Sequence, residues 1–68
     1  MPLVNIRVAG PGLTEQQKAD LIRGVTDVIV ETLHRPAELT MVIIDELDPD
    51  GVGLNGRSVS EVRRSRAQ

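Results

Sequence analysis

The stretch Met1–Val8 reads MPLVNIRV, and the rest of the chain is arranged around it. From residue 3 onward the side chains alternate in character, as they would on the two faces of an extended segment. One face carries Val4, Ile6 and Val8, and the other carries Leu3, Asn5 and Arg7. A period of two is typical of a β-strand that is buried on one face only. We therefore expect residues 3–8 to form a half-buried strand.

Pro2 is a candidate catalytic residue because of its place directly after the initiator methionine. Removal of Met1 would leave a secondary amine at the first residue of the strand. An ordinary α-amino group has a pKa of about 8, and apolar surroundings lower it, so such an amine can act as a base at neutral pH. Many cytosolic proteins begin with Met-Pro and use it for no chemistry. On these residues alone we therefore favour a Pro2 without a catalytic role, and the catalytic interpretation needs further support.

A long helix is predicted after a glycine- and proline-containing turn over residues 9–13. Thr14 and Gln17 form a capping-box pattern at its start. Apolar residues then recur at spacings of three and four, namely Leu21, Ile22, Val25, Val28, Ile29 and Leu33. This stripe predicts a helix that packs on a sheet with one side. Gly24 in its middle either allows the close approach of another backbone or is simply tolerated.

The helix is expected to end near His34, because Arg35 precedes a proline and is disfavoured in helical conformation. A cation at this position would complement the helix dipole, and we favour that interpretation over a catalytic histidine. Residues 36–39 are expected to form a single turn. Thr40–Leu47, nearly continuous in apolar character at its centre, predicts a parallel strand buried on both faces. Strand, helix and strand make a βαβ unit.

The C-terminal part is predicted to contain a hairpin over residues 52–59, because Asn55-Gly56 is a strong hairpin signal. We expect this hairpin to reach a neighbouring subunit. Residues 1–62 are expected to form a single domain and residues 63–68 a flexible basic tail with Arg63, Arg64 and Arg66.

The composition limits the class of protein. A chain of 68 residues buries too little surface to be very stable alone, and it has no cysteine, no aromatic residue and a single histidine. Oligomerisation is therefore the expected source of extra stability, and no metal or other cofactor is predicted. A net charge of −2 without aromatic stacking residues gives no support for nucleic-acid binding. No apolar run suits a membrane span or a signal peptide, so a cytoplasmic location is expected.

The layout resembles 4-oxalocrotonate tautomerase and its superfamily of short tautomerases. The resemblance covers residues 2 to about 64 and is carried by Pro2, the helix start TEQQK, the strand motif VIIDE and the hairpin GVGLNG. It implies a βαβ subunit that forms dimers with a four-stranded sheet, and three dimers in a hexamer. It also implies that Pro2 moves a proton between the oxygen of a dienol and a carbon of a conjugated 2-oxo acid.

This sequence departs from the family's pattern where substrate is bound. An arginine is usual in the loop after the first strand, but this loop reads Gly10-Pro11-Gly12-Leu13. A second family arginine falls on Met41, and an aromatic residue of the hairpin falls on Val52. The resemblance thus implies an apolar pocket lined by Leu3, Met41 and Val52. Arg57 first, and Arg7 second, are our candidates for binding a substrate carboxylate, and each is equally explained by an ion pair at a surface or interface.

Three functional hypotheses follow from these features. The chain is a Pro2-dependent keto-enol tautomerase, or a catalytically weak subunit of a hetero-oligomer with a paralogue, or a structural homo-oligomer. Pro2 supports the first, and the missing arginines support the second.

Overall fold

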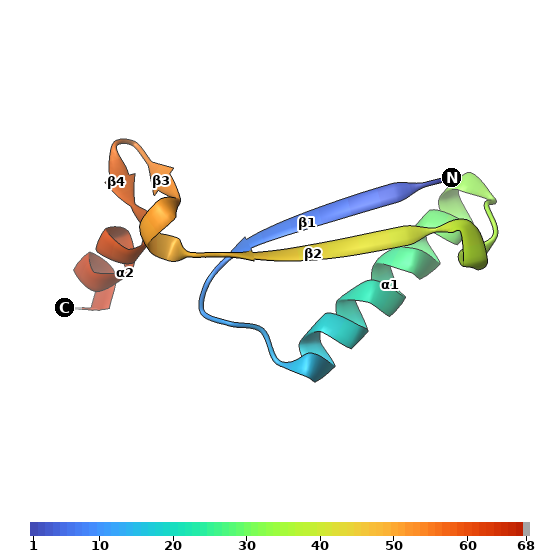
Figure 1. Cartoon of the computed structure of the whole chain (residues 1–68), viewed down its shortest axis with the longest axis horizontal. Coiled ribbons are helices and arrows are strands. Elements are labelled where there is room, and N and C mark those ends of the chain that lie inside the picture. Colours follow the sequence, from blue (N-terminus) through green and yellow to red (C-terminus); the bar gives the residue numbers. More distant parts are fainter. Residues whose placement is uncertain (68) are drawn as a thin grey trace.

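The computed structural model of the chain describes residues 1–67 and contains a βαβ unit followed by a hairpin and a short helix (Figure 1). The elements are β1 (Leu3–Ala9), α1 (Glu15–Leu33), the 3-10 helix η1 (Ala37–Leu39), β2 (Met41–Leu47), the 3-10 helix η2 (Pro49–Gly51), β3 (Gly53–Leu54), β4 (Arg57–Ser58) and α2 (Val59–Ala67). The predicted α/β fold class, with its βαβ unit and C-terminal hairpin, is confirmed.

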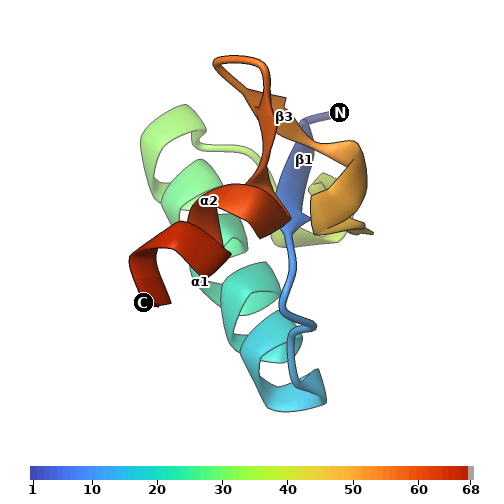
Figure 2. The ribbon, with the colours of Figure 1, turned by 90° about the vertical axis from the view of Figure 1, so that its left-hand side faces the viewer.

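β1 and β2 are parallel, and their register runs from Leu3 opposite Met41 to Ala9 opposite Leu47. Helix α1 lies along one face of this two-stranded sheet, and the opposite face is left open (Figures 1 and 2). The predicted alternation holds along β1, where the even positions 4, 6 and 8 are half-buried and the odd positions 3, 5 and 7 are exposed. Within one chain β2 is covered on its helix side only, so the burial of both faces expected for it requires a neighbour.

The ends of α1 follow the local sequence signals. The Gln17 N–H donates to the Thr14 hydroxyl at 3.0 Å, and the Thr14 N–H donates to the Gln17 side-chain oxygen at 2.9 Å, which confirms the predicted capping box. At the other end His34 adopts a left-handed conformation with φ 55°, and its N–H donates to the Val30 carbonyl.

The hairpin is present, with Asn55 and Gly56 both at positive φ, as a tight two-residue turn requires. The structure differs from the predicted flexible tail, because residues 63–67 form the last turns of α2; Gln68 lies outside the described residues. The Ser58 hydroxyl accepts the Glu61 N–H at 3.1 Å and so begins this helix. An Arg63 guanidinium N–H also donates to the Ala9 carbonyl at 2.9 Å, which joins α2 to the end of β1.

The single chain has no hydrophobic core of its own. Among residues 1–66 no side chain is fully buried, and Leu3 and Met41 on the open sheet face are 62% and 49% exposed. The radius of gyration is 15.4 Å, whereas a compact domain of this length has one of about 11 Å. Within residues 1–67 no helix is long and apolar enough to cross a membrane. The fold of the single chain thus leaves large apolar side chains exposed on its sheet and on α1.

Candidate active site

Pro2 lies immediately before β1, at the N-terminal end of the sheet. Its carbonyl accepts the Met41 N–H at 2.9 Å, so the backbone at Pro2 is fixed by the start of β2. Pro2 itself is half-buried, while Met1 before it is 82% exposed. An enzyme that removes Met1 would therefore meet an accessible residue, and its removal would leave the Pro2 amine at a fixed end of the sheet.

Leu3 and Met41 lie beside Pro2, as partners across the strand register. Both side chains project from the sheet face that is opposite α1. Ile43 continues this apolar surface along β2 and is 38% exposed. Three of the residues named from the sequence, Pro2, Leu3 and Met41, are thus brought together within one chain, and their surroundings are apolar.

Arg7 lies on the same face as Leu3 but toward the other end of β1. Its guanidinium is 3.9 Å from the Asp45 carboxylate, which also accepts a hydrogen bond from Asn5 at 3.2 Å. The Arg7 side chain is 70% exposed, so this is a loose surface ion pair that contributes little stability.

Arg57 and Val52 lie at the end of the molecule that is far from Pro2 (Figure 1). Arg57 is on β4, where its guanidinium donates to the Ser65 hydroxyl at 2.8 Å and approaches the Glu61 carboxylate at 3.8 Å. A polar groove of about 280 Å³ is lined by Arg57, Glu61, Arg64 and Ser65. One chain therefore does not bring Arg57 or Val52 to Pro2.

A carboxylate that the sequence reasoning missed lies near the end of β2. The Glu46 carboxylate accepts the Leu13 N–H at 2.6 Å and pairs with the Lys18 ammonium at 3.1 Å. These two contacts, with the Leu13 hydrogen bond as the larger cause, lower the pKa of Glu46 below its ordinary value of 4.5. The alternation of side chains along β2 could have indicated this contact, because it places Glu46 on the face of the strand that is directed toward the helix.

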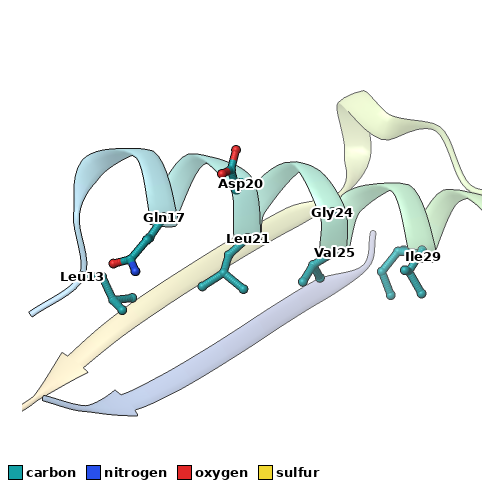
Figure 3. Close-up of a pocket in the computed structure, with 8 residues that line it drawn as sticks. Leu13, Gln17, Asp20, Leu21, Gly24, Val25 and Ile29 are labelled. Atoms are coloured by element: carbon teal, nitrogen blue, oxygen red, sulfur yellow. The ribbon is translucent and has the colours of Figure 1, made fainter. Parts of the chain in front are cut away.

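A second candidate site is an apolar groove of about 610 Å³ along α1. Figure 3 shows Leu21, Val25 and Ile29 on the side of α1 that faces the strands, whereas Asp20 points away from the strands. The groove is lined by Leu13, Gln17, Asp20, Leu21, Gly24, Val25, Val28 and Ile29. The only carboxylate in it, Asp20, bonds to Arg23 and Gln16, and these contacts, Arg23 first, lower its pKa. A surface this apolar suits a hydrophobic contact better than a polar substrate.

The described residues, 1–67, contain no group of three His, Asp or Glu side chains that could hold a metal ion. With Met1 removed, Pro2 would present a secondary amine beside the apolar side chains of Leu3 and Met41.

A family described as "Tautomerase enzyme" matches residues 2–62. A probable tautomerase, K2, from Dickeya dadantii is 48% identical over 64 residues, which are 94% of this chain and 96% of that protein. A 2-hydroxymuconate tautomerase from Pseudomonas sp. strain CF600 is 34% identical over 94% of this chain and the full length of that protein.

Solved structures give the same result. TomN, a 4-oxalocrotonate tautomerase homologue in the tomaymycin biosynthetic pathway, is 35% identical and superposes with a TM-score of 0.89 over 96% of this chain and 98% of that one. A heterohexamer 4-oxalocrotonate tautomerase from Chloroflexus aurantiacus J-10-fl is 28% identical, with a TM-score of 0.83 over 93% of this chain and the whole of that one. These similarities cover nearly the full length of this chain and of each protein compared with it, and they agree with the βαβ geometry. The chain therefore belongs to the tautomerase family, as its sequence motifs predict.

Proposed function

We propose that this chain is a keto-enol tautomerase that uses Pro2 as its general base, after removal of Met1, on a conjugated 2-oxo acid or dienol. The observation that carries the proposal is the position of Pro2, fixed through its carbonyl at the start of the sheet and flanked by exposed apolar side chains. Membership of the tautomerase family supports an isomerase activity in general.

The reaction needs one group that both accepts and donates a proton. The neutral Pro2 amine removes the proton from the enol oxygen, and the released electron pair forms the carbonyl double bond. The conjugated double bonds shift, and the resulting ammonium donates the proton to a carbon of the substrate. Substrate and product are isomers, so the step balances without an oxidant, a reductant or a cofactor.

The apolar neighbours of Pro2 favour this chemistry. In an oligomer that covers Leu3 and Met41, a charged ammonium beside them would be poorly solvated, and this desolvation would lower the amine pKa from the usual value of about 8. Positions 12 and 41 are glycine and methionine and not arginine. Desolvation is therefore the main influence that the adjacent residues have on the pKa of the amine.

A substrate carboxylate still needs a positive partner. Arg57 is our first choice and Arg7 our second, and Val52 is proposed to line the pocket with Leu3 and Met41. Both arginines are at least half exposed and hold their carboxylate partners at 3.8 and 3.9 Å, so a substrate could replace those partners at small cost. Because Arg57 is far from Pro2 in its own chain, it would have to come from a neighbouring subunit.

We propose a homo-oligomer, with a hexamer as the expected state. The open sheet face, the α1 groove and the absence of a buried core among the described residues all call for intersubunit contacts. Gly24 lies in the groove, and apart from its chain neighbours and the adjacent backbone of its own helix no atom lies within 4 Å of where its Cβ would be. A helix of a second chain could approach closely there.

A hetero-oligomer with a catalytic paralogue is the second candidate. The missing arginines favour it, and one similar structure is a heterohexamer. The purified chain should be assayed alone for ketonisation of phenylenolpyruvate and of 2-hydroxymuconate, together with its intact mass. Turnover by chains that lack Met1 supports the homo-oligomeric enzyme, whereas turnover that appears only with a second tautomerase chain supports the hetero-oligomer.

A further inference from the structure

The loop after β1 is tied to β2, and the residue just before it, Ala9, is tied to α2, although glycine and proline dominate the sequence of the loop. The Gly10 N–H donates to the Leu47 carbonyl at 3.1 Å, and the Leu13 N–H donates to the Glu46 carboxylate at 2.6 Å. Arg63 of α2 binds the Ala9 carbonyl. This loop, residues 10–13, therefore has a defined conformation.

Glu46 makes the two contacts that fix the far end of the loop. One carboxylate oxygen accepts the Leu13 N–H, and the other lies 3.1 Å from the Lys18 ammonium of α1. The ion pair alone is a partly exposed contact of small energy. The Leu13 hydrogen bond is different, because it is charge-assisted and determines where the loop backbone lies. A single carboxylate thus joins β2, the loop and α1.

The edge of β1 that does not pair with β2 indicates how a second copy could bind, and so which site the loop could reach. Pro2 and Gly10 direct their backbone groups toward β2, so the odd residues of β1 direct theirs outward. Arg63 occupies the outward carbonyl of Ala9. The outward backbone groups of Leu3, Asn5 and Arg7 remain available for pairing with another strand. They are placed symmetrically about Asn5. Antiparallel pairing with the same edge of a second copy would be centred there.

Such pairing brings together two regions that are far apart in one chain. With Asn5 opposite its counterpart, Pro2 of one copy lies opposite Val8 of the other. The loop that begins two residues later, at Gly10, would then lie beside the Pro2 amine of the first copy. In such a pair the loop of one copy would form part of the site at Pro2 of the other.

We propose that Glu46 is a positioning residue, which fixes the loop of residues 10–13 where it closes over the Pro2 site of a paired second copy. This inference rests on the proposed function. The loop has no charged side chain, so it acts on substrate through its shape and backbone, and both depend on where it is anchored. Loss of the anchor should weaken substrate binding more than it slows proton transfer.

The test compares four variants with the full-length protein, using phenylenolpyruvate as substrate. Glu46→Ala removes both contacts, and Glu46→Gln keeps an oxygen that can accept the Leu13 N–H. Lys18→Met removes the ion pair alone, and Arg23→Met is its matched control, because it breaks an ion pair on α1 that does not involve the loop. Hydrogen exchange of the Leu13 amide reports the anchor itself, and sedimentation confirms that each variant assembles like the wild type.

We expect Glu46→Ala to raise KM about tenfold with kcat little changed, the factor for one lost charge-assisted hydrogen bond. Glu46→Gln should recover most of this loss, Arg23→Met should match the wild type, and Leu13 exchange should accelerate in Glu46→Ala. If the wild type is active and the Glu46→Ala variant assembles normally but has the wild-type KM, the inference is wrong and the proposed function stands. A wild type without Pro2-dependent turnover would overturn the proposed function, and with it the role of the loop in catalysis.

Discussion

At the scale of single residues, the Glu46 carboxylate makes a prediction about acid stability. Its pKa is lowered in the folded chain, first by the Leu13 N–H and then by Lys18, so it contributes stability above its ordinary pKa. That contribution is lost as the pH falls through the lowered folded value, which lies below 4.5. The melting temperature should therefore drop as the pH falls below 4.5, and the drop should be smaller in Glu46→Gln. Asp20→Asn serves as a comparison, because the pKa of Asp20 is lowered by contacts that do not involve the loop.

The two candidate arginines give a second prediction at this scale. A guanidinium that binds the substrate carboxylate without stabilising the enolate should, when removed, raise KM and leave kcat nearly unchanged. We expect Arg57→Ala to raise KM about tenfold or more for phenylenolpyruvate, and Arg7→Ala to have a smaller effect. Steady-state kinetics with Arg66→Ala as the charge-matched control measures both. Wild-type constants in both variants would mean that another group binds the carboxylate.

At the scale of secondary structure, the α1 groove predicts where the subunits meet. Val28 lines the groove and is 60% exposed in the single chain. If a second chain covers it, Val28→Glu buries an unpaired charge there and should shift the protein toward smaller species. Ala19→Glu adds the same charge to an exposed position of α1 outside the groove and should leave the assembly unchanged. Equal sedimentation of the two variants would exclude the groove as an interface.

Most of these elements could be predicted from the sequence, because each carries its own local signal. The alternation of apolar and polar residues predicts β1, and the capping box and apolar stripe predict α1. Asn55-Gly56 predicts the hairpin. Helix α2 was missed because it has no apolar stripe and many charges, and its first turn depends on the Ser58 hydroxyl. Pro2 was predictable from its position. The contact of Glu46 with Leu13 and Lys18 was not, because it joins residues that the chain separates by a whole helix.

At the scale of the whole molecule, the lack of a buried core predicts an obligate oligomer. A hexamer should have six times the chain mass of 7.4 kDa, about 44 kDa. Analytical ultracentrifugation at micromolar concentration should show this species with little monomer, because an isolated subunit leaves its sheet face and the α1 groove in water. A folded monomer at that concentration would contradict the proposed assembly, and with it a site shared between chains.

The most direct test of the central claim is the turnover number of Pro2→Ala for phenylenolpyruvate, measured on protein whose intact mass shows that Met1 has been removed. The variant keeps an amino terminus but loses the secondary amine of proline and its fixed geometry. We predict that kcat falls about a hundredfold or more, while sedimentation matches that of the wild type. A wild-type kcat in Pro2→Ala, or turnover by protein that retains Met1, would contradict the assignment of Pro2 as the catalytic base.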